Sequence, residues 1–301
     1  MTQRIAIVGV GYTGTELARQ ALARSDTVVG TTRSSDGVRR LASLGVEART
    51  FDVLADEPEA LRGWFEPGDA VVYSVGTLFR EYADDTTPRR HVAPVVRVFE
   101  AAEAAGADRF VYLSSTSVYG DHGGRIVDEE SERRPSSPYG QMRRDIEDAL
   151  LARSSETSVA VARIVGIYGP GRNLAEYLRR GRFRLVDGGR KLSNRIHVAD
   201  LARTILAAVD RGAAGPRVYL VADGHPFPLV ELVDWMVEHL GVDRPPEVSL
   251  ADYRAERGPN RAARWHNEIR ASNHRIREEL GVELAFPDVF SGYRAIFADD
   301  T

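Results

Sequence analysis

A hydroxyl, a phenol and a cation lie in two short stretches of this 301-residue chain, and together they could carry out proton transfer. The first stretch, Ser114–Gly120, contains Ser115, and the second, Ser137–Arg143, contains Tyr139 and Arg143. Residues four apart share one face of a helix, so Tyr139 and Arg143 should point the same way. A tyrosine acting as a base near neutral pH needs its pKa lowered by roughly three units, or about 4 kcal/mol of phenolate stabilisation. A neighbouring cation can supply part of this, and the set then suits proton exchange at a carbinol or carbonyl carbon. The alternative is a capped helix with a buried tyrosine.

The chain opens with an apolar strand and a glycine-rich turn, a pattern typical of dinucleotide binding. The turn reads Gly9-Val10-Gly11-Tyr12-Thr13-Gly14, and helix-forming residues follow over Thr15–Arg24. The first glycine permits the tight turn, the second lets the backbone approach a diphosphate, and the third lets the helix pack close to the strand. The start of the helix would then bind the diphosphate through its free N–H groups. The predicted contacts are Gly9, Gly11, Tyr12, Thr13 and Gly14.

The residues after the second predicted strand, 27–32, favour NADP over NAD as the cofactor. An acidic residue at this place binds the ribose of NAD, whereas an arginine accommodates the 2′-phosphate of NADP. Here Arg33 and Ser34 follow the strand, and Asp36 comes later. We therefore predict that Arg33 and Ser34 bind a 2′-phosphate. A solvated loop arginine is the alternative.

The rest of the chain alternates between strand and helix patterns, which predicts an α/β fold with a doubly wound parallel sheet. The further strands are expected at 46–51, 70–75, 109–114, 158–164 and 217–221. The further helices are expected at 37–44, 56–65, 89–105, 138–153 and 199–210. Ligands of such sheets lie beyond the carboxyl ends of the strands, which adds these candidates: Asp52, Val53, Val75, Gly76, Thr77, Thr116, Val165 and Gly166. The polar stretch Gly120–Pro138 is expected to be a mobile loop over the cofactor site.

The composition is that of an ordinary globular protein. Hydrophobic residues make up 43% of the chain, charged residues make up 28%, and the formal net charge is −4. This balance gives no indication of nucleic-acid or membrane binding, so the expected partner is a small-molecule substrate. The chain has no cysteine, its histidines show no ligand-like spacing, and we expect no metal. A cytoplasmic location is expected, because the first residues form a strand pattern instead of a signal peptide.

These motifs resemble those of the extended or atypical short-chain dehydrogenases/reductases, the group that contains nucleotide-sugar epimerases and dehydratases. The resemblance covers nearly the whole chain. Beyond the residues above, it is carried by these segments: Arg163–Gly171, Arg195–Asp200, Ser272–Gly281, Phe286-Pro287 and Gly292-Tyr293.

The resemblance implies a Rossmann sheet with a smaller C-terminal substrate lobe, and it assigns the site residues. The Rossmann domain would comprise residues 1–165 and 196–222, and the lobe residues 166–195 and 223–301. Ser115 matches the catalytic serine or threonine of the family, and Tyr139 matches its catalytic tyrosine. Asp52 and Val53 would touch the adenine.

The chain departs from the family at two positions. The family has lysine four residues after its tyrosine, where it binds the nicotinamide ribose and lowers the pKa of the tyrosine, and this chain has Arg143. Arginine keeps the charge but is larger, planar and more demanding in orientation. Gly166 stands where the family often has asparagine. Dehydration is the least supported reaction, because Thr116 and Ser117 replace the Asp-Glu pair of dehydratases.

The prediction for function is an NADP-dependent oxidoreductase or epimerase that acts on a carbonyl or carbinol, with a sugar nucleotide as one candidate substrate. The alternative is an NADP-binding sensor or scaffold protein without turnover. Thr77, Thr116, Arg172 and Asn173 are candidates for substrate contact. His197 should order the turn before a helix that Asp200 caps. Relatives often dimerise through the helices at 89–105 and 138–153, so a homodimer is expected.

Overall fold

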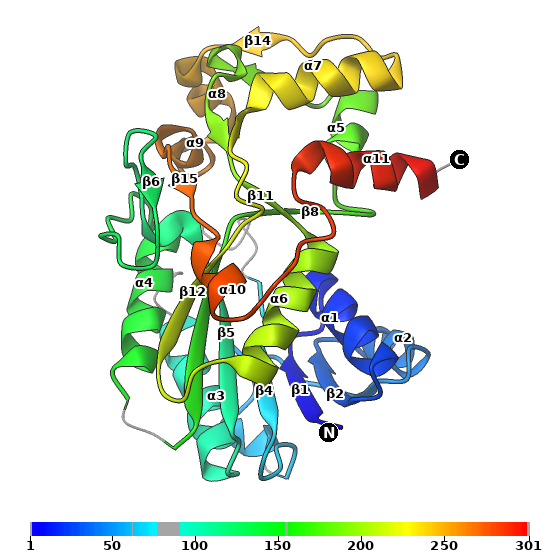
Figure 1. The fold of residues 1–301 in the computed structure, drawn as a ribbon, viewed down its shortest axis with the longest axis vertical. Coiled ribbons are helices and arrows are strands. Elements are labelled where there is room, and N and C mark those ends of the chain that lie inside the picture. The colour runs from blue at the N-terminus through cyan, green and yellow to red at the C-terminus, as the bar shows by residue number, and fades with distance from the viewer. Residues whose placement is uncertain (1, 62, 77–90, 154–155, 300–301) are drawn as a thin grey trace.

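A seven-stranded parallel sheet forms the centre of the protein (Figure 1). The computed structural model describes residues 2–61, 63–76, 91–153 and 156–299. The order of the strands is β12-β7-β5-β4-β1-β2-β3, and each pairs with its neighbours in parallel. Their bounds are β1 Arg4–Val8, β2 Thr27–Thr32, β3 Glu47–Thr50, β4 Ala70–Tyr73, β5 Arg109–Ser115, β7 Ser158–Ile164 and β12 Arg217–Val221. The order reverses direction between β1 and β4, and such switch points are where ligands bind.

Helices cover both faces of this sheet, which is why its central strands β1, β4, β5 and β7 are mostly apolar. All four residues of β4 are buried. One core cluster joins the sheet to α1, α2 and α6, and a second joins it to α3 and α4. The bounds of these helices are α1 Tyr12–Ala23, α2 Ser35–Ala42, α3 Val92–Ala104, α4 Pro138–Leu151 and α6 Val198–Arg211. The predicted α/β fold with a doubly wound Rossmann sheet is confirmed.

One expected helix is shorter than predicted. Of the described residues within 56–65, only Pro58–Leu61 form helix, as the 3-10 turn η1. The following Gly63 and Gly68 both have positive φ, a conformation that interrupts helices.

A third hydrophobic cluster lies away from the sheet. Its buried residues come from three stretches, 168–185, 227–236 and 289–297. Figure 1 shows α5, α7 and α11 together at the end of the molecule opposite the N-terminus. The remaining helical elements are η4 Thr116–Val118, α5 Ala175–Arg179, η5 Asp187–Gly189, α7 Leu229–Leu240, α8 Leu250–Arg257, α9 Pro259–His266, α10 His274–Glu278 and α11 Val289–Asp299. The remaining strands are β6 Ile126–Val127, β8 Gly166–Tyr168, β9 Leu185–Val186, β10 Leu192–Ser193, β11 Arg195–His197, β13 Phe227–Pro228, β14 Glu247–Val248 and β15 Arg270–Ala271. The division into two domains stays a prediction.

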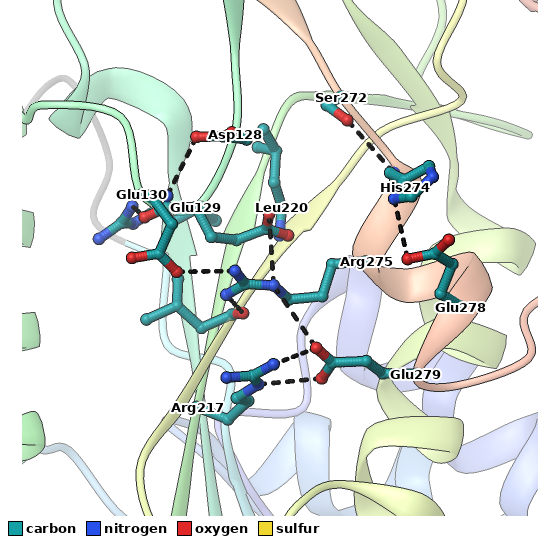
Figure 2. A network of polar contacts seen from close by, with 12 residues as sticks. Asp128, Glu129, Glu130, Arg217, Leu220, Ser272, His274, Arg275, Glu278 and Glu279 are labelled. Carbon is teal, nitrogen blue, oxygen red and sulfur yellow. Dashed lines mark hydrogen bonds and ion pairs between the residues drawn. The ribbon is translucent and has the colours of Figure 1, made fainter.

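The segment Gly120–Pro138 is held by many contacts, so the prediction of a mobile loop is wrong. Its β6 pairs with β15 in parallel. Glu129 accepts a hydrogen bond of 2.7 Å from the backbone N–H of Leu220, on the edge strand β12. Figure 2 shows Arg275 of α10 bridging Glu130 at 2.7 Å and Glu279 at 3.7 Å. The polar residues that suggested mobility therefore pair with other parts of the chain.

The start of α6 also differs from expectation. His197 caps the helix, its Nδ1 accepting from the N–H of Ala199 at 3.2 Å. Asp200 is fully buried, and its carboxylate accepts from the backbone N–H groups of Ala285 and Phe286 at 2.9 and 2.8 Å. Asp200 therefore ties the C-terminal segment to α6 instead of capping the helix.

Candidate active site

The glycine-rich turn after β1 has the shape that a dinucleotide needs. Gly9 has a φ of +88°, and a Cβ there would lie 2.6 Å from Cγ2 of Val75. A Cβ on Gly14 would lie 3.1 Å from the carbonyl oxygen of Gly9. A Cβ on Gly11 would meet no heavy atom within 4 Å, so the backbone there is open to a ligand. Gly9 is required by its φ and by packing, a side chain at Gly14 would be crowded, and Gly11 leaves room.

The start of α1 is suited to an anion. Gly11 occupies the N-cap without a side-chain cap, and the first turn has no acidic residue. The N–H groups and positive dipole end of such a helix attract a phosphate. The turn from Gly9 to Gly14 therefore fits the diphosphate of a nicotinamide dinucleotide.

The predicted adenosine contacts lie after β2 and β3. Arg33 is exposed. The Ser34 hydroxyl caps α2 by accepting from Gly37 N–H at 3.1 Å. Asp52 accepts from the N–H of Leu54 at 3.0 Å, and Val53 is buried in the second core cluster. The structure thus brings these residues to one edge of the sheet, and their roles toward adenosine stay predictions.

Ser115 and Thr116 lie where β5 ends. The Ser115 hydroxyl accepts a hydrogen bond of 3.2 Å from the N–H of Ser117 and caps the short turn η4. The Thr116 hydroxyl donates to the carbonyl of Ile164, at the end of β7, at 3.4 Å. Both side chains are half-buried at the carboxyl edge of the sheet.

Tyr139 and Arg143 lie on one face of α4, as their spacing predicts. The helix begins with Ser137, whose hydroxyl accepts from Gly140 N–H at 3.2 Å, and with Pro138 in its first turn. The Cζ of Arg143 lies 5.0 Å from the centre of the Tyr139 ring. A positive charge therefore stands beside the phenol.

Arg143 is fixed in place by β5. It is only 4% exposed, and its Nη1 donates to the Tyr112 hydroxyl at 2.7 Å and to the Leu113 carbonyl at 2.9 Å. Burial acts to lower the pKa of Arg143, but its attraction to Tyr112 and Tyr139 outweighs burial and raises the pKa above its usual value. The guanidinium therefore stays charged in a buried position.

A buried glutamate on α4 escaped the sequence analysis. Glu147 is 0% exposed, and its Oε1 accepts from the Ser114 hydroxyl at 2.6 Å. Its Oε2 accepts from Nε and Nη2 of Arg163 at 3.0 and 2.9 Å. The available signal was the spacing, because Tyr139, Arg143 and Glu147 follow one another at four-residue steps on one helix face.

At Gly166, where the chain departs from the family, the end of the Arg195 side chain lies close to the glycine. A Cβ on Gly166 would lie 2.0 Å from Nη1 of Arg195, so the guanidinium takes the space of a side chain. Arg195 was not among the predicted site residues. Val165 is buried beside Gly166, and a Cβ on Gly76 would meet nothing within 4 Å.

The residues predicted to contact the substrate lie in different places. Thr77 lies outside the described residues. Asn173 accepts from the N–H of Glu176 at 3.4 Å, at the start of α5. Arg172 stands over the ring of Tyr12, with 5.5 Å between its Cζ and the ring centre. Arg172 therefore lies next to the glycine-rich turn.

Another buried carboxyl group lies just beyond β12. Asp223 is 3% exposed, its Oδ1 accepts from His225 N–H at 2.9 Å, and burial raises its pKa to about 7. Its backbone N–H donates to the Arg195 carbonyl at 2.8 Å. Nothing in the sequence around it indicated burial.

Together, the glycine-rich turn and the residues at the strand ends define a Rossmann protein of the nicotinamide dinucleotide class. The model of the NAD dependent epimerase/dehydratase family matches residues 5–222, and the chain belongs to this family. The predicted resemblance is thereby confirmed, as is the predicted enzyme class of nicotinamide-dependent oxidoreductases and epimerases.

Individual relatives agree with this assignment. The chain is 28% identical over 294 residues to Protein YeeZ of Escherichia coli strain K12, covering 95% of this chain and 97% of YeeZ. It is 28% identical over 258 residues to the 4-hydroxy-2-methyl-3-oxo-4-farnesyl-3,4-dihydroquinoline-1-oxide ketoreductase of Stigmatella aurantiaca, covering 83% of this chain and 76% of that protein. The solved structure of a functionally unknown conserved protein from Silicibacter pomeroyi DSS is similar with a TM-score of 0.83 at 30% identity, covering 99% of each chain. Over the described ranges, no helix is long and apolar enough to cross a membrane.

Proposed function

We propose that the protein is an NADP-dependent oxidoreductase or epimerase that interconverts a carbinol and a carbonyl in a small molecule. The observation that carries the proposal is the position of Arg143. Its buried guanidinium lies beside the Tyr139 ring and is bound to the strand that ends in Ser115. A phenol, a fixed cation and a hydroxyl at one edge of the sheet are the groups that proton transfer to an alkoxide requires.

In this proposal Tyr139 holds and moves the proton. Its phenolic oxygen donates the proton to a forming alkoxide, or removes it from a carbinol in the reverse direction. The charge of Arg143 stabilises the phenolate that proton donation leaves. Two opposite unit charges about 5 Å apart interact by about 3 kcal/mol at an effective dielectric constant near 20. The dinucleotide, when bound, supplies or accepts the hydride.

Ser115 orients the substrate oxygen in this scheme. Its hydroxyl already accepts from Ser117 N–H, which leaves its proton available to donate to a substrate oxygen. The predicted contact of Arg143 with the ribose is also retained in the proposal.

Of the two reactions, we favour the reduction of a carbonyl substrate over epimerisation. The ketoreductase relative from Stigmatella aurantiaca supports this choice. A screen that follows NADPH consumption with ketones, and interconversion of nucleotide sugars in parallel, tests it. Tight NADPH binding without turnover on either set would favour the sensor or scaffold alternative.

We also propose a homodimer through α3 and α4, which light scattering tests, and a cytoplasmic location.

The preference for NADP rests on Arg33. We expect NADP(H) to bind at least ten times more tightly than NAD(H), about 1.4 kcal/mol, because a charge-assisted contact to the 2′-phosphate is available only to NADP. Arg33→Ala should remove the preference and leave NAD affinity nearly unchanged. Calorimetry with both cofactors measures this, and equal affinities in the parent would remove the argument.

A further inference from the structure

A rigid turn places Arg172. Gly169 and Arg172 exchange two backbone hydrogen bonds of 3.1 Å each. Pro170 and Gly171 occupy the two central positions, and Gly171 has a φ of +69°. Proline followed by a residue of positive φ is the pattern of a type II turn, which fixes the backbone on both sides. The backbone that carries the guanidinium therefore has little freedom.

This turn packs directly on the glycine-rich turn after β1. A Cβ on Gly169 would lie 2.6 Å from the hydroxyl oxygen of Tyr12. Tyr12 is the first residue of α1, and the Cζ of Arg172 lies 5.5 Å from its ring centre. Arg172 is exposed. The segment after β8 thus brings an arginine to the place where the backbone N–H groups of α1 begin.

The charges around Arg172 leave its positive charge uncompensated by this part of the protein. Burial raises the pKa of Tyr12 to about 12, so the phenol is neutral and attracts the guanidinium only through its ring. Glu16, one turn further along α1, is engaged by Arg19 at 2.7 Å and by Gln20 at 2.7 Å. Among the described residues, Arg172 forms no ion pair with a carboxylate.

The Tyr12 hydroxyl gives a second indication of a ligand. The oxygen is buried and has no hydrogen-bond partner within the described part of the chain. An unpartnered buried hydroxyl is costly, and it lies between the start of α1 and the turn that carries Arg172. A charged acceptor at this junction would have donors on both sides.

We propose that Arg172 binds the diphosphate of the nicotinamide dinucleotide, and so belongs to the cofactor site instead of contacting the substrate. The inference rests on the proposed function, since it requires that the chain binds this cofactor. The planar fork of arginine can donate two parallel hydrogen bonds to phosphate oxygens. The diphosphate would then lie between the N–H groups of α1 and the Arg172 guanidinium.

Fragments of the cofactor test this inference by calorimetry. Arg172→Ala should weaken binding of NADP and of ADP-ribose, which both contain the diphosphate, by about tenfold. It should leave the affinity for adenosine 2′-monophosphate, which lacks the diphosphate, unchanged. Arg172→Lys should retain part of the affinity, because it keeps the charge without the fork.

A matched control is Arg180→Ala. Arg180 is an exposed arginine eight residues further along, and it pairs with Glu176 at 2.7 Å. This variant should bind all three ligands like the parent. Thermal melts of each variant without ligand establish that it is folded.

The outcomes separate the inference from the proposed function. If the parent binds NADP and Arg172→Ala binds NADP and ADP-ribose equally well, the inference is overturned and the proposed function stands. A change in the KM for substrate alone would return Arg172 to the substrate site. A folded parent that binds no dinucleotide overturns both.

Discussion

At the scale of single residues, Arg143 differs from a lysine in how it is held. Its Nη1 is bound to the Tyr112 hydroxyl and the Leu113 carbonyl, so the cation is held against β5. It stays charged at any working pH and cannot pass a proton through itself. The proton that leaves or reaches Tyr139 must therefore travel through substrate, ribose or water. The positive charge contributes to electrostatics and positioning alone.

Tyr139→Phe removes the proposed acid/base and keeps the ring beside Arg143. We expect turnover to fall by about 100-fold or more, the range for losing such a group. Cofactor affinity should change little. Steady-state kinetics with an identified substrate and calorimetry with NADP measure the two effects. A Phe variant that retains most of its turnover would place the chemistry on another residue.

Arg143 can be varied in two ways that separate charge from shape. Arg143→Lys should retain NADP binding and keep or raise turnover, because a lysine can reach the ribose without the constraint of a planar fork. Arg143→Ala should weaken NADP binding by about 1.5–3 kcal/mol, the usual contribution of a charged hydrogen bond. It also removes the hydrogen bond that Arg143 donates to the Tyr112 hydroxyl, so a lower melting temperature is expected. Calorimetry on folded protein decides, and parent-like affinity in the Ala variant would remove Arg143 from the cofactor site.

At the scale of elements, α4 carries both the proposed chemistry and its support. Tyr139, Arg143 and Glu147 occupy successive turns of one face. Arg143 joins the helix to β5, and Glu147 joins it to β5 through Ser114 and to β7 through Arg163. The rotation of α4 relative to the sheet is thereby set by two buried polar side chains one turn apart, in addition to the apolar side chains of the second core cluster.

Glu147→Gln tests this support. The variant keeps the shape but leaves the Arg163 guanidinium without its buried counter-charge. Removing one partner of a buried ion pair costs about 3–5 kcal/mol, and urea unfolding should show a loss of this order. The control is Asp148→Asn on the same helix, whose exposed carboxylate pairs with Arg133 at 2.6 Å. Its effect should stay below about 1 kcal/mol, and equal losses in the two variants would contradict a special role for Glu147.

How much could be predicted from the sequence also differs from element to element. The strands of the sheet and the helices that cover it are encoded by apolar runs and local propensity, so their places were predicted within a few residues. Contacts between distant segments have no such local signal. The polar stretch Gly120–Pro138 was predicted to be mobile because the contact of Glu129 with Leu220 has no local signal. Asp200 was predicted to cap a helix because its partners, Ala285 and Phe286, lie far away in the sequence.

The same division applies to the candidate site. Motif spacing placed Tyr139, Arg143 and the glycines correctly relative to the fold. It could not show that Arg195 takes the space beside Gly166 or that Arg172 lies over Tyr12. Those contacts depend on how the segments after β8 and β10 return to the sheet, which no local pattern specifies.

At the scale of the whole molecule, Asp223 lies where the chain leaves the sheet for the elements of the third core cluster. The backbone N–H of Asp223 donates to the Arg195 carbonyl, and the side-chain amide of Asn273 donates to the backbone carbonyl of Asp223 at 2.9 Å. Three segments far apart in sequence therefore meet at this residue. Burial is the main cause of its raised pKa, nearby Asp288 and Asp200 raise it further, and Arg195 opposes them.

The ionisation of Asp223 should therefore make stability depend on pH. An unfolded aspartate has a pKa near 3.9, whereas the folded group has a pKa of about 7. The folded state binds the proton more tightly, so this group's contribution to stability is fully present below about pH 4. It is lost as the pH rises through 7. Asp223→Asn cannot ionise and should be more stable than the parent at pH 8, by about 1–3 kcal/mol for a poorly satisfied buried group. The difference should shrink toward pH 5.

The matched control is Asp234→Asn, an exposed carboxylate paired with Arg244 at 2.8 Å, which should show no such trend. Urea unfolding of the three proteins from pH 5 to 8 measures the slope, and a gap between parent and Asp223→Asn that does not widen with pH would show that Asp223 ionises without cost in the folded protein.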